Sequence, residues 1–149
     1  MEPIDKLVIR FLHKHHIFTL ATSNHNEPYV CSCFYVYLEK ENLIVFTSDY
    51  NTRHVHEIQN QPKVSGAIAL ETMVIGRIQG IQLTGFCWLL EGGILGKALA
   101  GYHKRFPVSL AMELTLWGIK PDYIKMTHNR LGFGKKLIWE DPEIQKKYL

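Results

Sequence analysis

A run of ten residues, Tyr29–Leu38, constrains the fold more than any other part of this 149-residue sequence. Read as a strand, it sends successive side chains to opposite faces. One face carries Tyr29, Cys31, Cys33, Tyr35 and Tyr37, and the other carries Val30, Ser32, Phe34, Val36 and Leu38. Because both faces hold apolar groups, we expect both to be covered.

Most of the expected strands follow one another as hairpins, without regular strand–helix–strand alternation, which favours an antiparallel barrel over a Rossmann-type sheet. The expected helices are 3–14, about 51–60 and 92–105, with a further turn or two at 108–114. The expected strands are 16–22, 29–38, 43–47, 63–70, 77–90, 117–119, 123–127 and 136–139, the sixth and seventh of these being separated by a Pro121–Asp122 turn. We therefore predict a mainly β protein, a β-barrel of six or seven antiparallel strands with about three flanking α-helices. It is expected to be a single domain over 1–149, with 141–149 as a polar tail that can fray.

The composition bounds the environment and the partners of the chain. No run approaches ~18 apolar residues, and the charged N-terminus lacks the apolar stretch of a signal peptide, so we expect a cytoplasmic protein with no membrane partner. The net charge is +3 with scattered basic residues, which makes RNA or DNA binding the weakest of three hypotheses.

Anion-binding groups gather in the segment LIVFTSDYNTRHVHEIQNQP, residues 43–62. An apolar strand ends in hydroxyls there, and a polar turn leads into a short helix that stops near Pro62. The first N–H groups of a helix lack internal partners and lie at the positive end of the helix dipole. The polar side chains around that point are Thr47, Ser48, Thr52, Arg53 and His54. Hydroxyls and a guanidinium at a helix start predict a phosphate site.

The order of elements, together with FTSDYNTRHVHEIQNQPKVS, resembles the flavin-binding split-barrel superfamily, which includes pyridoxamine 5'-phosphate oxidases and their small relatives. The resemblance implies that this segment holds the phosphate and ribityl chain of FMN. By position, Thr47 and Ser48 match the strand-end hydroxyls, Thr52 the helix-start hydroxyl and Arg53 the phosphate-binding Arg. His54 falls where the family usually has Lys, and a neutral imidazole supplies one donor and no full charge.

The resemblance also implies a homodimer, with FMN at the interface between the two copies. On that analogy, Gln79 and Gln82 on the long strand meet the flavin, and Lys135 and Lys136 contribute from the C-terminal strand. A narrower resemblance, carried by IQGIQLTG, YHKRFPV, DYIKMTHN and LGFGKKLIW, is to a subfamily of small uncharacterised bacterial split-barrel proteins.

Other chemistry finds less support in the sequence. Cys31, Cys33 and Cys87 are interpreted as buried free thiols; a redox pair or metal ligands at Cys31 and Cys33 is the alternative, and no metal site is predicted. His13 and His16 could share a metal at i,i+3, but the end of a helix explains them more simply. No carboxylate pair lies within the strands, which favours a bound cofactor as the source of any reaction.

The leading hypothesis is therefore an FMN-binding protein, in its enzymatic form a flavin-dependent oxidoreductase acting on a small molecule, with no catalytic residue assigned. The alternative is a non-catalytic binding or sensing split barrel for flavin, haem or another phosphorylated ligand. The substrate, the electron donor and the choice between FMN and a deazaflavin stay open.

Overall fold

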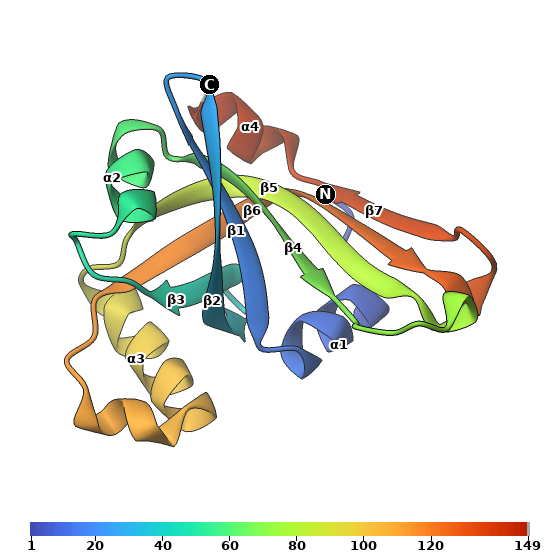
Figure 1. Ribbon diagram of the computed structural model, residues 1–149, viewed down its shortest axis with the longest axis horizontal. Helices are drawn as coiled ribbons and strands as arrows, with labels where there is room; N and C mark the ends of the chain where they lie inside the picture. The colour runs from blue at the N-terminus through green and yellow to red at the C-terminus, as the bar shows by residue number, and fades with distance from the viewer. Residues whose placement is uncertain (149) are drawn as a thin grey trace.

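The structure is a computed structural model that describes residues 1–148 (Figure 1). Its helices are α1 (Lys6–Lys14), α2 (Arg53–Asn60), α3 (Gly93–Arg105) and α4 (Pro142–Tyr148). Its strands are β1 (Ile17–Asn24), β2 (Glu27–Leu38), β3 (Leu43–Thr47), β4 (Lys63–Ala69), β5 (Gln79–Leu89), β6 (Leu116–His128) and β7 (Lys136–Glu140). Short 3-10 turns are η1 (Ile75–Arg77), η2 (Pro107–Ala111) and η3 (Asn129–Leu131).

All seven strands form one antiparallel sheet in the order β3-β2-β1-β4-β5-β6-β7. A further pairing of β3 with β6, from Ile44 opposite Ile119 to Thr47 opposite Leu116, closes six of the strands into a barrel. β7 lies outside this ring on the free edge of β6. The predicted mainly β barrel with flanking helices is confirmed.

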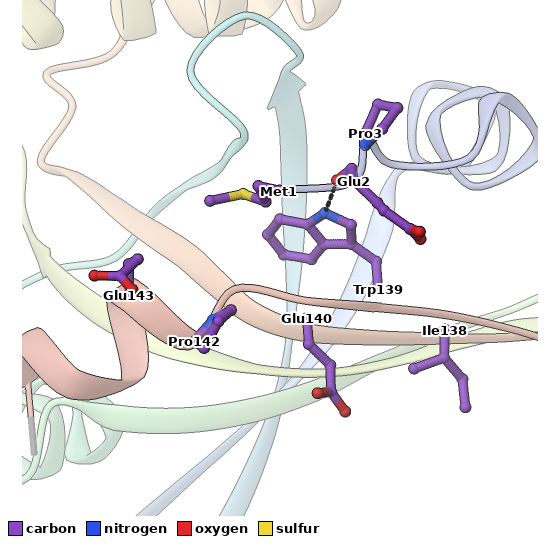
Figure 2. Close-up of a pocket in the computed structure, with 8 residues that line it drawn as sticks. All are labelled: Met1, Glu2, Pro3, Ile138, Trp139, Glu140, Pro142 and Glu143. Carbon is purple, nitrogen blue, oxygen red and sulfur yellow. Dashed lines mark hydrogen bonds between the residues drawn. The ribbon is translucent and has the colours of Figure 1, made fainter.

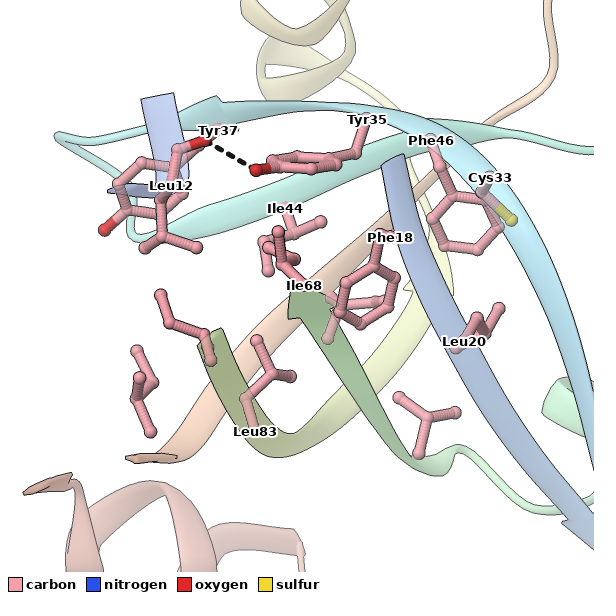
Figure 3. Packing of buried hydrophobic residues seen from close by; sticks show 14 of the residues in the cluster. Leu12, Phe18, Leu20, Cys33, Tyr35, Tyr37, Ile44, Phe46, Ile68 and Leu83 are labelled. Carbon is pink, nitrogen blue, oxygen red and sulfur yellow. Dashed lines mark hydrogen bonds between the residues drawn. The ribbon is translucent and has the colours of Figure 1, made fainter. Parts of the chain in front are cut away.

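The barrel interior is filled by one face of each strand, with Phe18, Leu20, Tyr35 and Phe46 fully buried (Figure 3). The Tyr35 hydroxyl donates to the carbonyl oxygen of Leu12 at 2.7 Å, which ties α1 to the core. Burying a phenol is favourable only when its O–H finds a partner, and this bond supplies it. α1 and α2 add buried side chains to the same core from different sides of the barrel, so both helices are held in place by packing (Figure 1).

α3 covers only half of the outer face of β2. Its buried residues Ala98 and Tyr102 pack with Val36 of β2 and with neighbours on β3. Further along the same face, Val30 and Phe34 are each 56% exposed. The expectation that both faces of this strand are covered is therefore wrong, within one chain, for its first half.

β6 is continuous across residues 117–127, so the predicted Pro121–Asp122 turn is wrong. Thr84 pairs with Tyr123 while Gly85 pairs with Pro121, which leaves Asp122 as the extra residue of a β-bulge. The fully buried Asp122 carboxylate accepts a hydrogen bond from Thr84 Oγ1 at 2.6 Å and pairs with the Lys63 ammonium group. A buried carboxylate is tolerated only with such partners, and they hold the bulge in register.

Residues 142–148, described above as part of a polar tail, form α4. Asp141 Oδ1 accepts the backbone N–H groups of Glu143 and Ile144, which caps the helix, and Pro142 suits its first position. Leu149 lies outside the described residues. Among the helices of residues 1–148, none has the length and apolar character needed to cross a membrane.

Candidate functional site

The N-terminus of α2 leaves backbone donors open. Thr52 is the N-cap residue, yet its hydroxyl donates to the carbonyl oxygen of Asp49 at 2.9 Å and does not cap the helix. The N–H groups of Arg53, His54 and Val55 consequently have no acceptor among the described residues. Three aligned donors at the positive end of a helix favour an anion.

Arg53 lies beside this end with most of its donors unused. Its Nε donates to Glu57 Oε2 at 3.3 Å, and its guanidinium carbon stands 4.2 Å from the centre of the Tyr29 ring. The four N–H groups on the two terminal nitrogens have no acceptor within the described chain. Stacking on Tyr29 fixes the plane of the fork, which can then bind a phosphate through two parallel hydrogen bonds.

The Arg53 side chain is 53% exposed and lies at the edge of a cleft. This cleft has a volume of about 270 Å³ and is lined by Asn24, His25, Glu27, Arg53, His56 and Glu57. The β1–β2 turn that supplies His25 and Asn26 has only these two residues, both with positive φ (49° and 65°), so it is tighter than the loop expected from the sequence. The cleft mixes cationic and anionic groups, and the 5% exposed Glu57 already offsets part of the charge on Arg53.

The predicted hydroxyls are only partly available. Thr47 Oγ1 donates to the carbonyl oxygen of Thr115 at 3.0 Å, so the hydroxyl proton is already used in a hydrogen bond within the protein. Ser48 Oγ lies 2.6 Å from Nε2 of His54, and Thr52 Oγ1 lies 3.5 Å from the same nitrogen. The structure therefore brings Ser48, Thr52 and His54 together, while Arg53 turns to Tyr29 and the cleft.

The two predicted glutamines face different surfaces. Gln82 lines a shallow cavity of about 340 Å³ on the outer face of the barrel. Gln79 lines another cavity, of about 230 Å³, together with Arg10 and Lys14 near α1. An odd separation of three residues along a strand puts the two side chains on opposite faces. Only Gln82 therefore lies on the outer barrel surface.

Lys135 and Lys136 lie at the tip of the β6–β7 hairpin, which points away from α2 (Figure 1). Both are exposed, and Lys136 Nζ donates to Thr127 Oγ1 at 2.9 Å. Within one chain, neither lysine joins Arg53. Their predicted role in cofactor binding stays a prediction.

A cavity of about 550 Å³ opens elsewhere, between the N-terminal residues, β7 and the start of α4 (Figure 2). The Trp139 indole, 8% exposed, donates to the carbonyl oxygen of Glu2 at 3.0 Å and so anchors the N-terminal segment. The cavity's charged side chains are Glu2, Glu140 and Glu143. Three carboxylates with no lysine or arginine side chain among the lining residues make this cavity a poor site for a phosphate.

Sequence reasoning missed a cluster behind the start of α2. Cys31 and Cys33 of β2 have their sulfur atoms 3.9 Å apart, and these atoms and a ring nitrogen of His54 all lie within 4.8 Å of one another. Hydrogen bonds from Cys33 and then from His54 lower the pKa of the Cys31 thiol to about 5, while the bond to Cys31 and burial raise the pKa of Cys33. The i,i+2 spacing of the cysteines was visible in the sequence, whereas the approach of His54 was not.

Comparison with solved structures shows that the chain has the split-barrel fold of pyridoxamine 5'-phosphate oxidase-related proteins. A haem-binding protein from Mycobacterium smegmatis superposes with a TM-score of 0.74 at 16% identity, covering 94% of this chain and 59% of that one. A pyridoxamine 5'-phosphate oxidase-related, FMN-binding protein from Nostoc punctiforme gives 0.67 at 13% identity, covering 97% and 94%. At such identities the likeness establishes the fold, and it confirms the resemblance found in the sequence.

Sequence relatives define the family more narrowly. A UPF0306 protein from Photorhabdus laumondii is 38% identical over 135 residues, which cover 91% of this chain and 94% of the relative. This chain belongs to the UPF0306 family. No family model matches the chain.

Proposed function

We propose that this protein binds FMN, with the phosphate at the N-terminus of α2 and the ring system on the outer face of the barrel. The observation that carries the proposal is that the first turn of α2 leaves two sets of donors unused: the N–H groups of residues 53–55 and the terminal nitrogens of Arg53. A phosphate is the ligand class that both kinds of donor favour. Solved split barrels that bind FMN support the choice of flavin.

The outer barrel face suits a flat ring. The 340 Å³ cavity there is floored by small residues of β1 and β4, namely Ala21, Ser65, Gly66 and Ala67, and Gln82 stands at its side. Small side chains let a planar group approach the sheet closely, and Gln82 offers both a donor and an acceptor to ring edges. Along β1, Ala21 lines this cavity and Asn24 lines the Arg53 cleft, about 10 Å further on at the usual rise of a strand. Because three residues separate them, the two side chains point to opposite faces of the strand, so a ligand in both sites would have to pass the end of β1.

A second copy of the chain would complete this site. The loop tips around η1 and η3 are joined by the bond from Asn129 Nδ2 to the carbonyl oxygen of Ile75, at 2.8 Å. Together they expose Met73 fully and Phe133 at 87%. Large apolar side chains at this exposure are typical of a surface that a partner covers. In a homodimer the same tip would bring its Lys135 and Lys136 toward the phosphate site of the other copy.

Turnover is the further step of the proposal. A bound flavin supplies hydride and electron transfer, which no side chain offers, and the protein contributes binding, orientation and electrostatics. We therefore propose a flavin-dependent oxidoreductase of a small molecule as the enzymatic function. The competing function is non-catalytic binding, including haem, which is motivated by the haem-binding relative of the same fold.

The test is a visible spectrum and a native mass spectrum of the purified protein, followed by titration with FMN and with haem. We expect a flavin-type spectrum or quenching of FMN fluorescence with micromolar affinity, and bleaching by a nicotinamide if the protein turns over. A colourless protein that leaves FMN fluorescence unchanged at ~100 µM would refute the proposal. A Soret band on haem titration without FMN binding would establish the competing function instead.

A further inference from the structure

We infer that Cys31, Cys33 and His54 form a binding site for a thiophilic cation, with Zn²⁺ as the ion of best chemical match. The three ligand atoms, two sulfurs and one imidazole nitrogen, lie within 4.8 Å of one another. They form the only such group of three among the residues that the structure describes. This site is distinct from the proposed phosphate site, which uses Arg53 and backbone N–H groups.

The sulfur atoms are spaced for a metal. Alternation along β2 sends Cys31 and Cys33 to the same face, and their Sγ atoms are 3.9 Å apart. Two thiolates bound to one zinc at ~2.3 Å in tetrahedral geometry would be about 3.8 Å apart. A disulfide would need about 2.05 Å, so the thiols are unbonded. Little movement of the strand is required to bind an ion.

The imidazole is held by its own polar contacts. Ser48 Oγ lies 2.6 Å from His54 Nε2, and Thr52 Oγ1 lies 3.5 Å from it. Metal-binding histidines are normally oriented by a hydrogen bond at the ring nitrogen that does not bind the metal, so these contacts at Nε2 assign Nδ1 as the ligand atom. His54 also belongs to the first turn of α2, whose positive end favours the thiolate form that a metal requires.

The donor set determines the class of ion. Two thiolates and an imidazole suit Zn²⁺ or Cu⁺ and are poor ligands for Mg²⁺ or Ca²⁺, which prefer oxygen. Two thiolates neutralise Zn²⁺ fully, so a partly buried site is left without net charge. Three protein ligands leave a fourth position for water or a substrate atom. Cys33 is buried while Cys31 and His54 are half-buried, so the site can be entered from the side of Cys31.

The experiment begins with the reduced, chelator-treated full chain and titrates it with Zn²⁺ against a chromophoric chelator, and separately with Co²⁺ as a spectroscopic probe. We expect one ion per chain and a thiolate-to-cobalt charge-transfer band. Cys31→Ser and His54→Gln should each weaken Zn²⁺ at least 10-fold, and Cys31→Ser should weaken the band. Zn²⁺ should raise the melting temperature of the native chain and leave that of Cys31→Ser unchanged.

Cys87→Ser is the matched control, because Cys87 is a buried thiol of the same core that lies outside the cluster. It should bind Zn²⁺ and Co²⁺ as the native protein does. Zn²⁺ affinity equal in native protein and in Cys31→Ser would overturn the inference, as would absence of binding at ~50 µM Zn²⁺. FMN titration of Cys31→Ser separates the two proposals, since Cys31 takes no part in the phosphate site: FMN affinity there should be unchanged.

Discussion

Replacing Arg53 with Ala tests the phosphate site through the difference between two ligands. FMN carries a phosphate and riboflavin does not, so removing the guanidinium should weaken FMN and leave riboflavin binding unchanged. A charged hydrogen bond contributes about 1.5–3 kcal/mol. Because the Arg53 side chain is 53% exposed and shares its charge with Glu57, we expect the lower part of that range.

A loss of about 1.5–2 kcal/mol corresponds to about 10- to 30-fold weaker FMN binding. The assay is quenching of flavin fluorescence for FMN and riboflavin, in native protein, Arg53→Ala and Arg53→Lys. Lysine keeps the positive charge but loses the paired donors of the guanidinium, so the FMN affinity of Arg53→Lys should fall between those of the native protein and Arg53→Ala. The control is Lys104→Ala, which removes one exposed positive charge from α3.

Arg53→Ala also leaves the nearly buried Glu57 without its ion partner, so the melting temperature of each variant must be measured alongside. The titrations are run well below the lowest melting temperature, where every variant is folded. An Arg53→Ala protein that binds FMN as the native chain does, or that loses riboflavin affinity in the same proportion, would refute a phosphate-specific role for this side chain.

Three further predictions concern the thiol cluster and the stability of the barrel. The pKa of Cys31 is lowered to about 5, so its alkylation rate should stay nearly constant from pH 6.5 to 8.5. An ordinary thiol gains thiolate over this range, and a rate that rises with pH in the same way would contradict the lowered pKa of Cys31. Gly85→Ala should destabilise the fold by about 1–3 kcal/mol in urea unfolding, because a Cβ there would lie 2.4 Å from the Lys120 carbonyl oxygen; an unchanged midpoint would disprove this close approach. Asp122→Ala should cost about 1–2 kcal/mol by the same measurement, because it removes the hydrogen bond from Thr84 and the ion pair with the 38% exposed Lys63, and an unchanged midpoint would show that these contacts do not hold the bulge.

The parts of the fold that the sequence predicts are those set by local pattern. The apolar runs of residues 29–38 and 43–47 match β2 and β3 closely, because short runs of β-branched and aromatic residues bounded by turn residues are a local property of the sequence. The β-bulge at Asp122, in contrast, depends on contacts with residues far away in the sequence. Its partners Lys63 and Thr84 are 59 and 38 residues away, so a Pro–Asp pair that reads locally as a turn is held in a strand by contacts that local pattern does not contain.

α4 and the thiol cluster show two further limits. The cap of α4 is local, since Asp141 bonds to residues 143 and 144, and an Asp-Pro-Glu start was visible in a tail that looked too polar to order. The cluster, in contrast, depends on which side of α2 meets β2. Cys31 and His54 are brought together only when the helix packs on the barrel, so their proximity depends on tertiary structure and cannot be predicted from local sequence.

Adjacent residues on a helix point about 100° apart, so Arg53 and His54 in the first turn of α2 contact different parts of the protein. Arg53 and His54 cannot both face one ligand; one stacks on Tyr29 at the cleft, and the other meets Ser48 and the thiols. His54, at the position where the split-barrel resemblance implies a lysine, would therefore point away from the proposed phosphate site and add no charge to it. Arg53 and three backbone N–H groups then face a dianion with about one and a half positive charges, counting the helix end as half a charge. Tight FMN binding would therefore need a further positive charge, and we expect the exposed Lys135 and Lys136 of a second copy to supply it in the proposed dimer.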